Sequence, residues 1–431
     1  MSHINNGKNE GRFFWYPLDN AAKIFPAITN RKVTSVFRIS AVLKSAVHVK
    51  SLFQAVREIE DRFPYFKVKM RKGFFWYYLE SASFDVPVLP DEGEPCRRFA
   101  RRGHMFRVLV ADNKISVEFS HILTDGTGAF EFLKTIQARY FEIRGTVLPS
   151  DFVFMKAGDI PDKEEFEDAY NRFFDPEIPA SVKRPKAFHL PFKNARDHRF
   201  DVLNAILKAK QLKSIAKDKG VSITVYLTSI YLMALQEVFE ETGGTRKHHK
   251  AQKLCVEIPI NMRNIYPTRT MRNFSLFVMP GIDRSLGHYT FDEILKTVYH
   301  QMHLETDEKL VNKMLARHVG SERKLIIRAI PLFVKSLFLR LSYYSLGSSQ
   351  YSGVITNLGR VVLPPEIEQH LNCLAFTPPP PNKLIKVSCG VISMGDKLVI
   401  NFGNITETKD LERRIVKHLV NDGLDIKLSV F

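Results

Sequence analysis

The sequence predicts a mixed α/β protein, with mixed α+β sheets, that is built from two lobes. The chain has 431 residues, of which 45% are hydrophobic and 25% charged, so it is long enough to form two domain-sized cores. Strand-like alternation and helix-like periodicity follow one another in a similar order in both halves. Residues 171–196 contain four prolines and little periodicity, which is typical of a linker. We therefore expect a first lobe over 1–170, a linker over 171–199 and a second lobe over 200–431.

The first half opens with alternating strand and helix patterns. The helical segment at 49–62 places Leu52, Ala55, Val56 and Ile59 on one stripe. Two aromatic, β-rich runs on either side of a turn at 71–73 indicate a hairpin. In order, the expected elements are a strand at 32–40, the helix at 49–62, the hairpin of 63–70 and 73–80, strands at 106–111 and 114–121 joined by Asp112-Asn113, and a helix from about Gly126 to Arg144.

The second half restarts with a strand and carries long helical patterns in its middle. It closes with strands on either side of a proline-rich breaker, then a helix and a last short strand. The expected elements are a strand at 200–209, helices near 210–218 and 223–241, a strand at 253–260, helical patterns at 291–317 and 322–343, the segment 352–361, the breaker at 376–381, strands at 384–392 and 397–402, and a helix near 408–422.

Composition and charge narrow the functional classes. The formal net charge of +17 indicates anionic partners, and basic clusters lie at 96–104 and 245–253. Each cluster taken alone is best interpreted as a solvated loop. A phosphate-bearing small molecule would satisfy the same charge, and no nucleic-acid-binding motif is present. The cysteines, at positions 96, 255, 373 and 389, form no CxxC pair. We therefore expect their thiols to be reduced and their side chains to serve only in packing.

Targeting and membrane signals are weak. The N-terminus lacks the charged and apolar regions of a secretory signal, so a cytoplasmic location is expected. The longest hydrophobic stretch, 329–347, carries Lys335 and Arg340 in its middle. Inserting each of these charged residues into a bilayer core would cost roughly 2.5–3.5 kcal/mol. We expect a buried or surface-packed helix there and no transmembrane segment.

One motif stands out as a candidate catalytic centre, His121-Ile122-Leu123-Thr124-Asp125-Gly126. Strand alternation puts His121 on the inward face with the apolar residues before it. Asp125 then falls at a helix N-terminus, where its carboxylate can accept backbone N–H bonds. Gly126 leaves room beside it for a sharp turn or a ligand. A lone histidine at a strand end is more often a satisfied core residue, and Asp-Gly is a common turn.

The chain resembles the superfamily of CoA-dependent acyltransferases, whose shared signature is HxxxDG, found here from His121 to Gly126. This superfamily includes chloramphenicol acetyltransferase, nonribosomal-peptide condensation domains, plant BAHD acyltransferases and alcohol acetyltransferases. Less specific resemblances lie at 257–264, 271–279 and 354–360. Two departures matter, because Ser120 stands where condensation domains usually carry a second histidine, and residues 401–405 (NFGNI) do not match the BAHD DFGWG motif. The chain is most similar to free-standing bacterial alcohol acetyltransferase-like proteins.

The resemblance implies both a fold and a chemistry. It implies two chloramphenicol-acetyltransferase-like lobes with an active-site tunnel between them, and a segment at 352–392 that crosses towards the N-terminal lobe. His121 would be the general base, while Asp125 would pair with Arg263 and fix the loop as a structural residue. The candidates for the oxyanion or tunnel position are Asn273, Thr356 and Asn357.

The same resemblance indicates the substrates. Acyl-CoA would be a co-substrate, with acetyl as the first acyl group to consider and a small-molecule alcohol or amine as acceptor. No bound cofactor, metal or nucleic acid is expected. His300 and His303 lie one helical turn apart without an obvious third ligand, and His248-His249 falls in a charged loop. The alternatives are a condensation-like enzyme that uses an acyl carrier protein, and a catalytically silent binding module of the same fold.

Overall fold

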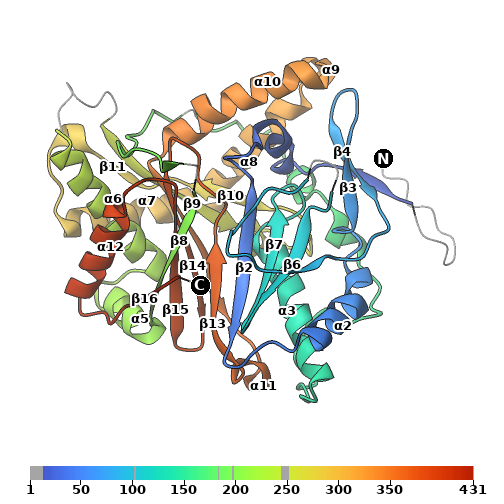
Figure 1. Cartoon of the computed structure of the whole chain (residues 1–431). Helices are drawn as coiled ribbons and strands as arrows, with labels where there is room; N and C mark the ends of the chain where they lie inside the picture. Colours follow the sequence, from blue (N-terminus) through green and yellow to red (C-terminus); the bar gives the residue numbers. More distant parts are fainter. Residues whose placement is uncertain (1–12, 101–102, 183, 197–198, 244–251, 431) are drawn as a thin grey trace.

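The computed structural model describes residues 13–100, 103–182, 184–196, 199–243 and 252–430, and it has the mixed α/β architecture predicted (Figure 1). Two large sheets form its frame. A five-stranded sheet has the order β13-β2-β7-β6-β5, and an eight-stranded sheet has the order β10-β9-β12-β14-β15-β8-β16, with β11 paired to β9. A small three-stranded sheet, β1-β4-β3, lies beside the first.

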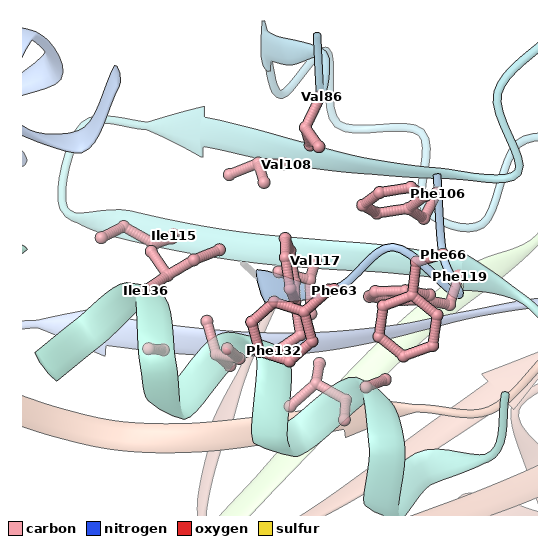
Figure 2. Packing of buried hydrophobic residues seen from close by; sticks show 14 of the residues in the cluster. Phe63, Phe66, Val86, Phe106, Val108, Ile115, Val117, Phe119, Phe132 and Ile136 are labelled. Carbon is pink, nitrogen blue, oxygen red and sulfur yellow. The ribbon is translucent and has the colours of Figure 1, made fainter. Parts of the chain in front are cut away.

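The five-stranded sheet holds the first core. Its central hairpin, β6 (Phe106–Ala111) and β7 (Lys114–Ser120), is antiparallel with Ala111 opposite Lys114, as the alternation predicted. Rings from the helix that follows pack on it, and Figure 2 shows Phe132 against Phe119, with ring centroids 5.6 Å apart. The other elements of this half are β1 (Trp15–Pro17), α1 (Phe25–Ile28), β2 (Val36–Leu43), α2 (Val49–Ile59), β3 (Val68–Lys72), β4 (Tyr77–Ser81), β5 (Val88–Pro90), α3 (Gly126–Ile143) and α4 (Ala169–Arg172).

The eight-stranded sheet holds the second core. Its strand β12 is parallel to both β9 and β14, and helix α6 covers one face with a nearly continuous apolar surface. The elements are β8 (Asp201–Lys208), α5 (Ala209–Asp218), α6 (Ile223–Glu241), β9 (Lys253–Asn261), β10 (Ser275–Val278), β11 (Gly281–Asp283), α7 (Phe291–Glu305), α8 (Glu308–Arg323), α9 (Leu325–Ala329), α10 (Leu332–Ser342), β12 (Gly353–Val361), α11 (Pro365–Glu368), β13 (Leu371–Thr377), β14 (Val387–Met394), β15 (Lys397–Asn404), α12 (Asp410–Asn421) and β16 (Lys427–Ser429).

One strand joins the two halves. Of the strands within 352–392, β13 pairs antiparallel with β2 of the first sheet, whereas β12 and β14 lie in the second sheet. Figure 1 shows β13 beside β2, between the two halves. Residues on both sides of the expected linker also share a cluster, in which Tyr170 packs with Phe274 and Leu276. The lobe boundaries at 1–170, 171–199 and 200–431 stay a prediction.

Three sequence-based expectations differ from the structure. The long helical patterns are interrupted, because Asp307 caps a new helix through Lys309 N–H, and Pro331 separates α9 from α10. The first strand of the predicted hairpin begins at Val68, since Phe63 and Phe66 lie in a turn with their rings in the core. The breaker at 376–381 begins inside β13, a strand that the local pattern did not predict.

No single helix within the described ranges is both long and apolar enough to cross a membrane. Helices α5 and α6 together, bent by 83° at their junction, have the length and composition of a broken span. Most of α6 is buried in the second core. The four cysteines are unpaired, and of these Cys255 alone is partly exposed.

Candidate functional site

His121 follows β7 directly and is held by both sheet and aromatic contacts. Its backbone N–H donates to the Ser35 carbonyl at 2.9 Å. The imidazole ring stacks on Phe25, at 5.3 Å between centroids, and tilts against Phe37 at 4.5 Å. Burial among these rings lowers the pKa of His121, although the Asn273 side chain, the Asp125 carboxylate and the Thr124 backbone favour its charged form. The imidazole is therefore neutral near pH 7 and available as a base.

The orientation of Asn273 favours one tautomer of the His121 imidazole. Its Nδ2 donates to Asp19 Oδ2 at 3.0 Å and to the backbone carbonyl of His121 at 2.9 Å. Its Oδ1 consequently faces His121 Nδ1, at 3.4 Å. Rotating the amide by 180° would set its oxygen against two acceptors, so the contact is favourable only when Nδ1 is protonated. Nε2 then holds the free lone pair.

Asp19 is a buried acid that supports this arrangement. Besides Asn273, it accepts the backbone N–H of Ala22 at 2.8 Å, and Arg272 Nε lies 3.7 Å from its Oδ2. Burial raises the pKa of Asp19 to about 6, against the opposing effect of the Arg272 guanidinium. Sequence reasoning missed Asp19, because its surroundings come from a segment 254 positions away and no local pattern marks it.

Asp125 and Arg263 meet, and each makes several further contacts. Arg263 Nη1 lies 2.9 Å from Asp125 Oδ2, and that oxygen also accepts the backbone N–H of Phe274 at 2.8 Å. Asp125 Oδ1 caps α3 by accepting from Thr127 and Gly128 N–H. Both side chains of the pair are about nine-tenths buried. Both carboxylate oxygens thus already accept hydrogen bonds, from an arginine and from backbone N–H groups. This arrangement fits a loop-fixing role better than that of a proton acceptor.

The glycines at the start of α3 let other segments approach closely. A Cβ on Gly126 would lie 2.6 Å from Leu358 Cδ2 of β12. A Cβ on Gly128 would lie 2.5 Å from the Met271 carbonyl, which already accepts from the Thr124 hydroxyl at 2.6 Å. Two segments of the second half therefore pack directly on the start of α3.

The structure separates the three oxyanion candidates. Both amide hydrogens of Asn273 are used, so it has none to offer a substrate. Asn357 Nδ2 donates to Thr224 Oγ1 at 3.0 Å, towards α6. Thr356 pairs with Gly390, and a Cβ on Gly390 would point at Phe376. The Phe376 ring contacts Phe37, and the Phe37 ring contacts His121. Among the three, Thr356 is the candidate whose face of the sheet points to the first half.

The described residues of the two basic clusters are not among the hydrogen-bond and ring partners of His121. Arg97 of the 96–104 cluster pairs with Glu92 and Glu94, while residues 101–102 and 244–251, including His248 and His249, lie outside the described residues. No group of three or more metal-ligating side chains occurs in the part of the chain that the structure describes. Two surface hollows, of about 330 and 390 Å³, are lined by neither His121 nor Asn273.

Comparisons with known proteins identify the fold. No family model matches the chain, and no curated protein matches it in sequence. A trichothecene 15-O-acetyltransferase from Fusarium sporotrichioides has a TM-score of 0.60 at 10% identity, over 97% of this chain and 96% of its own. A second F. sporotrichioides protein, in complex with coenzyme A and T-2, has a TM-score of 0.59 at 8% identity, over 96% and 99%. Polyketide synthase associated protein 5 from Mycobacterium tuberculosis gives 0.59 at 12%, over 94% and 96%.

These similarities extend over nearly the whole of each chain. The two-lobed fold implied by the HxxxDG resemblance is therefore confirmed, because this chain shares it with a trichothecene 15-O-acetyltransferase, polyketide synthase associated protein 5 and an epimerization domain of tyrocidine synthetase.

Proposed function

We propose that the protein transfers an acyl group, acetyl in the first instance, from a coenzyme A thioester to a hydroxyl or amine acceptor, with His121 as the general base. The observation that carries the proposal is the orientation of Asn273, whose oxygen favours a proton on Nδ1 of His121 and thereby a lone pair on Nε2. The neighbours that carry out acetyl transfer or bind coenzyme A on the same fold support the choice of substrates.

The reaction needs no covalent enzyme intermediate. Nε2 of His121 removes the proton of the acceptor O–H or N–H as that oxygen or nitrogen attacks the thioester carbonyl carbon. The tetrahedral intermediate then collapses, the C–S bond breaks, and the proton on Nε2 passes to the departing sulfur. The products are the ester or amide and free coenzyme A, and His121 returns to its neutral state.

Three further features support this step. The lowered pKa of His121 keeps the imidazole neutral, and hence basic, at neutral pH. The Thr356 hydroxyl makes no hydrogen bond to another described residue, so it is available to donate to the developing oxyanion. Asp125 and Arg263 act by holding the start of α3 against the segment at Phe274.

The direct test measures free thiol released from acetyl-CoA and longer acyl-CoAs across a panel of alcohols and amines. His121→Ala should lower turnover by about 10²–10⁴-fold, the usual contribution of general acid–base catalysis. The matched control is His370→Ala, because the exposed His370 ring stacks on Phe141 and not on the site. Near-normal thiol release by a folded His121→Ala protein would refute the mechanism.

The second candidate is a condensation-like reaction with an acyl group on a carrier protein. The fold similarity to polyketide synthase associated protein 5 and to an epimerization domain of tyrocidine synthetase favours it. Turnover with a carrier-bound acyl group, together with inactivity towards every free acyl-CoA, would select this reaction. A folded protein inactive with both donors would instead be a silent binding module.

A further inference from the structure

Helices α9 and α10 present large apolar side chains to solvent. On α10, Phe333, Leu337 and Leu341 recur every four residues, and these side chains are 71%, 59% and 57% exposed. Such spacing forms one continuous stripe along the helix. On α9, Leu325 and Ile326 are each 80% exposed. Figure 1 shows both helices along an outer edge of the molecule.

The orientation of α10 is inverted for a surface helix. Within it, only Leu332 and Lys335 are buried, so a lysine points inward while phenylalanine and leucine point outward. Lys335 Nζ donates to the Phe75 carbonyl at 3.1 Å and lies 3.6 Å from the ring centroid of Trp76. These contacts fix the rotation of the helix, so the outward apolar stripe is a built feature of the fold.

The tip of the β3–β4 hairpin extends the same surface. The backbone N–H of Leu332 donates to the Phe74 carbonyl at 2.9 Å, which joins the tip to the start of α10. Phe74 is 71% exposed, and Phe75 is 44% exposed. We call the combined surface the α9–α10 face, and it comprises Phe74, Phe75, Leu325, Ile326, Phe333, Leu337, Phe338 and Leu341.

Basic residues surround the α9–α10 face. Lys324, Arg328 and Arg340 are exposed on or beside the same helices, and Lys72 is exposed beside the hairpin tip. Residues 323–365 contain no aspartate or glutamate, and the whole chain has a net charge of +17. An apolar stripe with a cationic border matches the two layers of an anionic lipid surface, which are acyl chains beneath negatively charged headgroups.

We propose that the α9–α10 face docks on an anionic lipid bilayer, with α10 lying in the plane of the interface. Phe333, Leu337 and Leu341 enter the acyl boundary, and the surrounding lysines and arginines contact headgroups. Docking of this kind goes beyond the proposed acyl transfer and does not depend on it. It also has a structural link to the site, because α10 packs on α1, which carries the Phe25 ring that stacks on His121.

The test is co-sedimentation of the full chain with vesicles of phosphatidylcholine alone and with added phosphatidylserine. We expect binding to the anionic vesicles, weaker binding to the neutral ones, and release as salt is added. Replacing Arg328 and Arg340 by glutamine should lower the partition coefficient on anionic vesicles by about five-fold per charge. Equal binding of the wild-type protein to both vesicle types, or to neither, would overturn the proposal.

A matched pair of triple variants isolates the apolar stripe. Phe333→Ser, Leu337→Ser and Leu341→Ser together should reduce the partition coefficient by about ten-fold for each side chain. The control combines Val147→Ser, Ile160→Ser and Val182→Ser, which alter scattered side chains that are 85%, 90% and 86% exposed. The control should bind like the wild type, and both variants should keep their circular dichroism and melting temperature. Equal loss in both variants would show that the stripe has no special role.

Self-association is the competing occupant of the α9–α10 face. Sedimentation velocity without lipid would detect a dimer, and a dimer abolished by the stripe variant while vesicle binding persists would refute the proposal. A second readout comes from the chain's two tryptophans, Trp15 and Trp76, which both lie at the three-stranded sheet. Lipids brominated on their acyl chains should quench the wild-type fluorescence and leave that of the stripe variant unchanged.

Discussion

The side-chain oxygen of Asn273 faces Nδ1 of His121 at 3.4 Å, because the nitrogen of the same amide is already bonded to Asp19 and to the His121 carbonyl. One side chain thus contacts three groups at once and leaves a single favourable tautomer for the histidine. The contact is long for a hydrogen bond, so its main effect is on orientation and tautomer, with a smaller effect on binding energy.

The first prediction concerns the pH dependence of Asn273→Ala. Asn273 raises the pKa of His121, so its removal should lower that pKa further below the usual 6.5. The acid limb of kcat/KM should therefore move to lower pH, while the plateau falls by about 3–10-fold, the value of one net hydrogen bond. A pH–rate profile of the two proteins checks this. An unmoved acid limb with a lower plateau would assign Asn273 a purely structural role.

The second prediction concerns the contact between Gly126 and β12. Gly126→Ala would bring a Cβ to 2.6 Å from Leu358 Cδ2, so the side chain or the start of α3 must shift. We expect a destabilisation of about 1–3 kcal/mol, typical of overpacking, and reduced turnover because α3 begins next to Asp125. Melting curves and thiol release measure the two effects.

A second substitution distinguishes this clash from a general effect of alanine. Leu358→Ala should relieve it, so the double variant should be more stable than the sum of the single losses predicts. Gly320→Ala is the control, because Gly320 lies inside α8 and a Cβ there would meet only the Phe174 ring, at an ordinary van der Waals distance of 3.6 Å. Additive losses at 126 and 358 would show that the two positions do not interact.

The third prediction concerns Glu257, whose carboxyl makes no hydrogen bond or ion pair with the described residues. It lies on β9 opposite Val354, and burial raises its pKa to about 8, from 4.5 for a free side chain. The folded protein therefore binds this proton more tightly than the unfolded chain. The resulting stability is fully present below pH 4.5 and is lost as the pH rises to about 8, at about 1.4 kcal/mol per pKa unit.

Glu257→Gln keeps the size and removes the titration. The unfolding free energy of this variant should fall less than that of the wild type between about pH 4.5 and pH 8. Denaturant unfolding at several pH values measures the difference, and the exposed Glu177→Gln serves as control. Parallel curves for Glu257→Gln and the wild type would mean that the carboxyl is ionised without cost in the folded state.

The sequence predicted the parts of the fold that depend on local periodicity. The β6–β7 hairpin and helix α3 were located almost to the residue, because alternation and helical spacing are written in neighbouring positions. Strand β13 was missed because its partner is β2, at the other end of the chain, and because prolines follow its last residues. The pairing of this strand is entirely long-range.

The site divides in the same way. The HxxxDG spacing located His121 and the cap at Asp125, since both follow from a strand that runs directly into a helix. Asp19, Phe25 and Phe37 gave no signal, because their contacts with the site depend on how distant segments pack. Two adjacent candidates on β12, at 356 and 357, lie on opposite faces of that strand, and only its pairing in the sheet separates them.

The last prediction tests whether Asp125 is architectural. Its pair with Arg263 is largely buried, so deleting either charge strands the other in a medium of low dielectric. Asp125→Asn and Arg263→Met should each destabilise the protein by roughly 3–5 kcal/mol. Asp125→Asn keeps the shape of the side chain, but one of its two oxygens becomes an NH₂. Because both oxygens now accept backbone N–H groups, at Phe274 and at the start of α3, either orientation of the amide sets a donor against a donor.

The double variant decides between a pair and two independent residues. If Asp125 and Arg263 act as one unit, removing both should cost less than the sum of the single losses, which equilibrium unfolding of the four proteins measures. Strict additivity would contradict the coupling. Turnover gives a second comparison. If Asp125 only fixes the loop, its replacement should lower turnover in proportion to how far His121 is displaced. If Asp125→Asn melts normally but is as inactive as His121→Ala, Asp125 takes part in the reaction itself and does not merely hold the loop.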